Sequence, residues 1–174
     1  MLKSIGPGNE NGAHFDITGK YRYSLWREWQ PGGKRVAFIL LNPNRADAVR
    51  DDPTIRRCIG FARSWGCGSV EVVNLFAFRT GDPLRLRKIS EPVGSANDRY
   101  LLRASRRAWK VVAGWGNHGG LRDRDRQVLR LLGDRTGLYC LGITRTRQPR
   151  HPLYTRGDLP LIRFRPSDIA DPKE

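Results

Sequence analysis

The fold is decided by the stretch Val36-Ala-Phe-Ile-Leu-Leu-Asn42-Pro43-Asn44, in which six apolar residues run into a polar turn that proline stiffens. The run shows no alternation of apolar and polar residues, which is typical of a strand covered on both faces in a parallel sheet. It is short and follows Pro31-Gly32-Gly33, which favours a strand over a buried helix. Ligands of open α/β sheets bind beyond the carboxyl ends of the strands, so we expect Asn42, Pro43 and Asn44 at a binding site.

Further apolar runs along the chain also end in polar or glycine-rich segments. They predict strands at 69–75, 110–113 and 138–142, with a last edge strand within 159–164. Residues 14–26 predict an N-terminal β-hairpin that turns at Gly19-Lys20.

Helical patterns separate the predicted strands. The first helix begins after Asp52, an N-cap residue followed by Pro53, and the others cover 97–108 and 121–132. This alternation predicts an α/β fold, a three-layer α/β/α sandwich with a mostly parallel central sheet and the N-terminal β-hairpin. We expect a flexible N-terminal arm at 1–12, a single α/β domain at 13–166 and a C-terminal tail at 167–174.

The charge of the chain is its strongest compositional feature. Among 174 residues, 32 Lys and Arg stand against 17 Asp and Glu, a formal net charge of +15. Arginine supplies most of the excess, and its planar fork binds phosphate and stacks on bases, so a nucleic-acid partner is expected. The alternative is that the arginines reflect a GC-rich coding background.

Other compositional features bear on location and cofactors. Three cysteines, Cys58, Cys67 and Cys140, are an odd number without metal-ligand spacing, which favours a reduced cytoplasmic protein. The first seven residues lack the apolar core of a signal peptide, and no run approaches the ~20 apolar residues of a membrane span. We therefore expect no secretion and no membrane partner, and the sequence predicts no metal and no cofactor.

Four loops at one predicted edge of the sheet carry polar motifs. These are Asn42-Pro43-Asn44, Asn74-Leu75-Phe76, Gly116-Asn117-His118 and Arg150-His151-Pro152. An asparagine that ends a strand usually satisfies its own backbone, and a lone histidine in a loop is usually structural. The common order and location of the motifs favour a shared site.

This constellation resembles the uracil-DNA glycosylase superfamily. Asn42-Pro43 is similar to its first motif, Asn74 to the asparagine that reads the base, and His151-Pro152-Leu153 to its third motif. The chain departs from the pattern at Asn42, where many members have a carboxylate although the mismatch-specific branch has Asn, and at Leu153, where Ser is usual. The strings Leu41–Asn44, Asn74–Arg79, Gly114–His118 and Arg150–Tyr154 more closely resemble an uncharacterised bacterial family of unknown function, over residues 14 to 164.

The glycosylase resemblance implies hydrolysis of an N-glycosidic bond in DNA after a modified or mismatched base is flipped out. It implies catalytic roles for Asn42, which would hold the water, and for His151, which would assist the leaving base. Because an amide activates water only weakly, we expect a general base in the next loop, Asp47, with Asp51 and Asp52 as alternatives. The implied base-binding residues are Pro43, Asn44, Asn74, Phe76, Phe78, Asn117 and His118. The implied contacts to the nucleic-acid backbone are Arg79, Arg145, Arg147, Arg150 and Tyr154.

Two alternatives remain open from the sequence. The first is a non-catalytic nucleic-acid-binding module of the same fold. The second is a nucleoside or nucleotide hydrolase, in which the glycines of Gly116 to Gly120 and the helix after them would hold a phosphate. For the glycosylase and for the binding module, the expected partner is DNA rather than RNA. The protein is expected to be a monomer.

Overall fold

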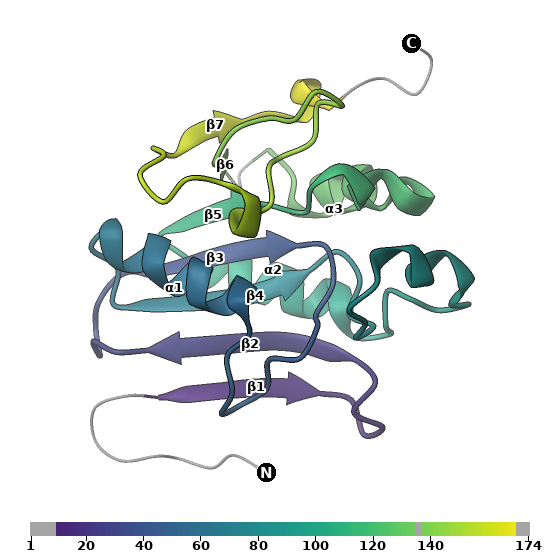
Figure 1. The fold of residues 1–174 in the computed structure, drawn as a ribbon, viewed down its shortest axis with the longest axis horizontal. Coiled ribbons are helices and arrows are strands. Elements are labelled where there is room, and N and C mark those ends of the chain that lie inside the picture. The colour runs from purple at the N-terminus through teal and green to yellow at the C-terminus, as the bar shows by residue number, and fades with distance from the viewer. Residues whose placement is uncertain (1–9, 135–136, 170–174) are drawn as a thin grey trace.

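The computed structural model describes residues 10–134 and 137–169. Within this part of the chain, seven strands form one sheet in the order β1-β2-β4-β3-β5-β6-β7 (Figure 1). Their bounds are β1 (Asn11–Phe15), β2 (Arg22–Glu28), β3 (Arg35–Leu40), β4 (Ser69–Asn74), β5 (Lys110–Ala113), β6 (Leu138–Cys140) and β7 (Ile162–Phe164).

The sheet is mixed, so the prediction of a mostly parallel sheet is wrong. Strand β3 pairs in parallel with β4 and β5, and β5 pairs in parallel with β6. The N-terminal hairpin adds β1 and β2 antiparallel at one side, and β7 returns antiparallel to β6 at the other. The α/β class and the hairpin are confirmed.

The apolar run at 36–41 forms the central strand β3 and the residue after it, as the sequence predicts. Val36, Phe38 and Leu40 belong to one apolar core cluster, whereas Ala37 and Ile39 belong to the other. All five are at most 3% exposed. Burial of each larger side chain contributes about 1.5–3 kcal/mol, so β3 requires cover on both faces.

Helices supply that cover. Helix α1 (Pro53–Ser64) packs Ile55 and Cys58 into the cluster of Val36, while α2 (Asn97–Arg107) and α3 (Arg124–Leu132) pack Leu101 and Val128 into the cluster of Ala37. In Figure 1, α1 crosses in front of the sheet. The Asp52 carboxylate accepts a hydrogen bond from the Ile55 N–H at 2.9 Å, which confirms the predicted N-cap.

The glycine-rich turn after β5 differs from the prediction. Instead of leading directly into a helix, residues Asn117–Asp123 form the short 3-10 segment η2, which is kinked at Leu121. Arg122 and Asp123 both adopt positive φ, and α3 begins only at Arg124. A phosphate cradle would need the N-terminus of α3 directly after the glycines. Because η2 intervenes, the N-terminus does not lie there. Other 3-10 segments are η1 (Pro83–Lys88), η3 (Pro152–Tyr154) and η4 (Pro166–Asp168).

The edges of the domain are set by packing. Strand β1 begins at Asn11, inside the predicted arm at 1–12, whose residues 1–9 lie outside the described part. Ile169, which falls in the predicted tail at 167–174, is 7% exposed and belongs to the core, and the tail's last five residues are outside the description. Of the described helices, none is both long and apolar enough to cross a membrane.

At the far edge of the sheet, β7 has only three residues. Phe164 faces the core, while Ile162 and Arg163 are exposed. Pro160 precedes the strand and Pro166 follows it.

Candidate functional site

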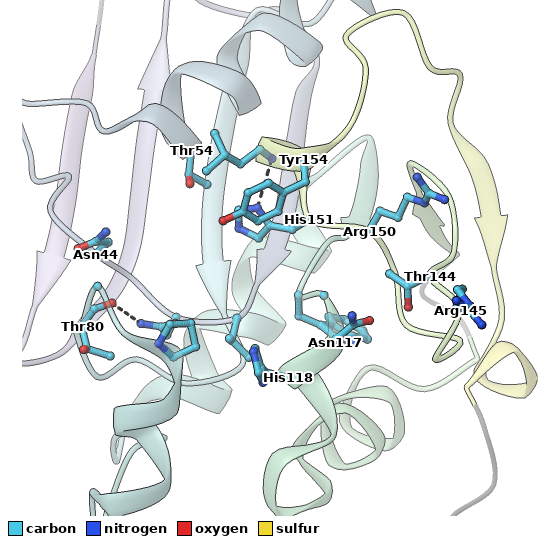
Figure 2. A pocket seen from close by; sticks show the side chains of 17 residues that line it. Asn44, Thr54, Thr80, Asn117, His118, Thr144, Arg145, Arg150, His151 and Tyr154 are labelled. Atoms are coloured by element: carbon cyan, nitrogen blue, oxygen red, sulfur yellow. Dashed lines mark hydrogen bonds between the residues drawn. The ribbon is translucent and has the colours of Figure 1, made fainter. Parts of the chain in front are cut away.

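A cavity of about 570 Å³ opens at the carboxyl ends of the parallel strands, where the sequence predicts a site. Segments after β3, β4, β5 and β6 all contribute to its wall (Figure 2). Its lining residues are Leu41, Asn42, Asn44, Thr54, Thr80, Gly81, Pro83, Trp115, Gly116, Asn117, His118, Thr144, Arg145, Arg150, His151, Leu153 and Tyr154. The cavity volume is in the range of small-molecule and cofactor sites.

Asn42 is held in one orientation by its neighbours. Its Nδ2 donates to the carbonyl oxygens of Thr80 at 2.8 Å and Pro43 at 3.0 Å. Two acceptors at one end of the amide identify that end as the NH₂ group. Oδ1 must then lie on the other side, and it accepts no hydrogen bond from the described residues. Asn42 therefore offers the pocket a fixed acceptor.

His151 enters the pocket in a defined protonation state. Its Nδ1 accepts a hydrogen bond from the Leu153 N–H at 3.2 Å, so the neutral ring carries its proton on Nε2. Burial lowers the pKa of His151 to about 4, although the negative charge of Asp52 acts in the opposite direction. The Tyr154 ring lies 5.6 Å from the His151 ring. At neutral pH the pocket thus contains an imidazole N–H donor without charge.

Another part of the wall is polar and positively charged. Asn117 Oδ1 accepts from the Thr146 hydroxyl at 2.7 Å, which leaves the Asn117 NH₂ group as a donor. Arg150 donates through Nε to the Ile143 carbonyl, and its terminal nitrogens make no bond to described residues. Arg145 is exposed beside them (Figure 2). These groups supply donors and positive charge, the combination that binds phosphate.

A buried network that the sequence did not reveal fixes this wall. Trp115 Nε1 donates to Gln148 Oε1 at 2.7 Å, and Gln148 Nε2 donates to Asp125 Oδ2 at 2.9 Å. The three residues are at most 7% exposed. A Cβ at position 119 would overlap the indole of Trp115, so the glycine there is required for close approach. The network joins the loop after β5, the loop after β6 and α3.

Several predicted base-binding residues do not line the pocket. Asn74 is 1% exposed, and within the described residues neither atom of its amide has a hydrogen-bond partner. Phe76 is fully buried in the core beside α2 and α3. Phe78 is half-buried and packs edge-on against Tyr21, with ring centroids 5.6 Å apart. Pro43 is buried, and its carbonyl binds the Thr80 N–H at 3.0 Å.

The predicted general base and two predicted arginines also lie outside the lining. Asp47 Oδ1 accepts from the N–H groups of Val49 and Arg50, which lower the pKa of its carboxyl and tie it to its own loop. Arg79 donates to the backbone oxygens of Asn44, Gly19 and Arg45. Arg147 donates to those of Ser167 and Asp168. Of the alternative bases, Asp51 pairs with Arg27, and Asp52 is buried as the α1 cap.

The structure therefore brings together eight predicted site residues and adds others. Those that share the pocket are Asn42, Asn44, Asn117, His118, Arg145, Arg150, His151 and Tyr154. Lining residues that sequence reasoning missed include Thr54, Thr80 and Thr144. Each is a small polar residue shortly after the end of a strand or at the start of a helix. This position in the sequence could have predicted that they line the site.

The site has no carboxylate in its lining among the described residues. Nor does any group of three His, Cys, Asp or Glu side chains in the ranges 10–134 and 137–169 lie close enough to hold a metal ion.

Fold and site define an α/β protein with a polar, partly cationic pocket at the carboxyl ends of its parallel strands. The chain belongs to a family described as protein of unknown function (DUF1643), whose model matches residues 22–153. The match runs from β2 into η3 and includes every residue that lines the pocket except Tyr154. No curated protein matches the chain, and no solved structure does.

Proposed function

We propose that the protein is a DNA glycosylase-like enzyme that hydrolyses the N-glycosidic bond of a modified or mismatched base. The observation that carries the proposal is the pairing of two groups in one pocket: a fixed amide acceptor on Asn42 and a neutral imidazole donor on His151. Helices against both faces of the sheet are also what the three-layer sandwich of uracil-DNA glycosylases requires.

The two groups suit the two charges that develop in the reaction. When the C1′–N bond breaks, its electron pair leaves with the base, and the sugar becomes an oxocarbenium-like cation. The His151 Nε2–H would donate to the base as negative charge develops. Asn42 Oδ1 would accept a hydrogen bond from a water molecule that then attacks C1′, and the proton that this water releases would neutralise the departed base anion. Because the sugar cation is strongly electrophilic, it reacts with a neutral water molecule. Asn42 therefore needs only to orient this water and does not need to deprotonate it before the attack.

The position of Asn42 also accounts for an amide where many glycosylases have a carboxylate. A carboxylate in the same place would direct an oxygen at the carbonyl oxygens of Pro43 and Thr80. An amide satisfies both carbonyls and keeps one acceptor for water. The two backbone carbonyls beside Asn42 thus explain why an amide stands where many glycosylases have a carboxylate.

Base recognition would fall to residues that line the pocket, above all Asn44, the free NH₂ group of Asn117, and His118. The buried Asn74 lies outside this lining. Tyr154 is 81% exposed at the pocket and offers a face for base stacking. Arg145 and Arg150 would bind the phosphate backbone of the strand that carries the flipped base. The proposed substrate is DNA rather than RNA, and the proposed location of the protein is the cytoplasm.

The experiment incubates the protein with oligonucleotides that carry uracil, hypoxanthine, mismatched or alkylated bases, followed by alkaline cleavage at abasic sites. We expect strand breaks on at least one substrate and their loss in Asn42→Ala and His151→Ala. Gln30→Ala, which removes an exposed amide before β3, is the matched control and should keep wild-type activity.

A non-catalytic nucleic-acid-binding module is the second candidate. The observation that favours it is the lack of a carboxylate among the described lining residues, since an amide cannot take a proton from water. Binding of lesion-bearing DNA without strand breaks, weakened by Tyr154→Ala, would select the module and exclude the glycosylase. Cleavage of free nucleosides or nucleotides without activity on DNA would contradict both.

A further inference from the structure

A row of cations on aromatic rings crosses the sheet away from the pocket, from the start of β3 and β5 to Tyr139, which is level with Phe38 in the middle of β3. The ammonium groups of Lys34 and Lys110 lie 4.6 and 4.4 Å from the centre of the Trp109 ring. Lys110 also lies 4.6 Å from the Tyr139 ring, and the Arg163 guanidinium lies 5.1 Å from it. The Arg63 guanidinium lies 4.5 Å from the Trp29 ring. We call these seven residues the cation–aromatic row.

Backbone contacts join the members of the row. The Trp29 indole donates to the Cys67 carbonyl just before β4, and Lys34 immediately precedes β3. The Trp109 N–H donates to the Arg35 carbonyl, and Tyr139 pairs with Arg163. The row thus follows the sheet from β4 through β3, β5 and β6 to β7. Four strand spacings correspond to roughly 19 Å, over which one strand of a B-form duplex presents about five phosphates.

The four cations of the row form no ion pair with the described residues. The ion pairs between described residues do not include Lys34, Arg63, Lys110 or Arg163. Arg35, by contrast, lies at the start of β3 and pairs with Glu28 and Glu71. An aromatic face attracts a cation but does not neutralise it. Trp109 is 42% exposed, so the row is accessible.

We propose that the cation–aromatic row is a second nucleic-acid surface that binds the phosphate backbone, separate from the pocket. A linear series of unpaired cations complements a linear polyanion, and the chain's net charge of +15 favours the same partner. The Lys34 end of the row and the pocket lie at opposite ends of β3, whose six residues span about 20 Å. Because no residue of the row lines the pocket, the two surfaces can hold separate nucleic-acid segments at once.

The first test measures the salt dependence of DNA binding. The variant Lys34→Gln/Arg63→Gln/Lys110→Gln/Arg163→Gln should bind an undamaged duplex at least tenfold more weakly. Its slope of log affinity against log salt should be shallower by about 3.6, because each of the four lost phosphate contacts removes roughly 0.9. The control Lys20→Gln/Arg56→Gln/Arg87→Gln/Lys88→Gln removes the same charge from exposed sites outside both surfaces. Equal slopes in the two variants would overturn the proposal.

The second test separates the row from the pocket. A protein with both surfaces should co-capture a lesion-bearing duplex and a differently labelled undamaged one, and His151→Ala should still bind the undamaged duplex. The undamaged oligonucleotide should also change tryptophan fluorescence in wild type, and the change should be smaller in Trp109→Phe, which keeps Trp29 in the row. Failure of excision with intact co-capture contradicts only the glycosylase proposal. Binding of polyglutamate as tight as that of DNA with equal charge would refute a nucleic-acid surface.

Discussion

Asn42 and Asn74 both stand at the end of an apolar run, but Asn42 lies two residues after β3, whereas Asn74 is the last residue of the neighbouring parallel strand β4. Asn42 lines the pocket, with its NH₂ group on two carbonyls and its oxygen available. Asn74 is 1% exposed, and its amide has no partner among the described residues. The register of β3 against β4 explains the difference, since Asn74 pairs with Leu40, two residues before Asn42.

Pairing of the β4 segment continues beyond Asn74. The N–H groups of Leu75 and Phe76 donate to the carbonyls of Leu40 and Leu41, so Phe76 lies nearly level with Asn42. The chain therefore stays buried to Ala77 and reaches the pocket only at Thr80. A polar residue at the end of an apolar run thus belongs to a site only if the neighbouring strand ends at the same level.

The largest effect should come from Asn42→Ala. Loss of the acceptor that orients the water should lower base excision by about 10³-fold, within the range for a positioned catalytic group. Loss of the two hydrogen bonds to the carbonyls of Pro43 and Thr80 should lower the free energy of unfolding by about 1–2 kcal/mol. Single-turnover excision and urea unfolding measure the two effects. A rate within threefold of wild type would show that the two asparagines do not differ in function.

Asn42→Asp tests why an amide stands at this position. At pH 7 the carboxylate would face the carbonyl oxygens of Pro43 and Thr80, which should lower the free energy of unfolding by about 3 kcal/mol. The loss should shrink as the pH falls, because a protonated Asp can donate one of the two bonds. Urea unfolding of wild type and variant at pH 7 and pH 4 measures the difference. A variant as stable as wild type at pH 7 would contradict this orientation of the amide.

The protonation state of His151 provides the next test of the pocket. The pKa of His151 in the folded protein, about 4, lies below the ordinary histidine value of 6.5, so the unfolded chain binds more protons between these values. The contribution of the neutral ring is therefore fully present above pH 6.5 and is lost as the pH falls to 4. Wild type should lose about 3 kcal/mol more over this window than His151→Gln. The NMR shifts of the ring nitrogens should show a neutral Nε2–H form at pH 6, and titration near 6.5 would contradict it.

The smallest effect should come from Asn74→Leu, which matches the buried amide in shape. A buried amide without partners is costly, so the apolar isostere should raise the free energy of unfolding by about 1 kcal/mol. Thermal or urea unfolding measures this change. Destabilisation would show that Asn74 has a partner, such as a buried water. If excision by the stabilised variant falls by tenfold or more, Asn74 acts on the base after all.

Local sequence patterns were sufficient to predict most of the elements. The continuous run at 36–41, the Asp52 cap and the Gly19 turn each act over a few residues, and each is confirmed. The mixed character of the sheet was not predictable in the same way, because strand direction depends on pairing between β2 and β4, more than forty residues apart. The kink at Leu121 was missed since the glycines and the helical pattern after them suggested direct continuity.

The site was predictable as a set of loops and less so as a set of side chains. Strand ends placed Asn42, Asn117 and His151 at one edge, and the pocket contains all three. Other predicted site residues do not line the pocket, because they are buried or bound elsewhere. Phe76 is buried in the core, and Arg79 donates hydrogen bonds to backbone oxygens. Such partners come from distant segments and leave no local pattern.

The short last strand has a consequence for assembly. An exposed sheet edge presents unpaired N–H and C=O groups that can recruit a strand of another chain. Strand β7 has only three residues, Arg163 points outward from it, and Pro160 and Pro166, which lack an N–H, flank it. Its free edge is thus too short and too charged to template further strands. This limits edge-to-edge growth through β7, as the monomer expected from the sequence requires.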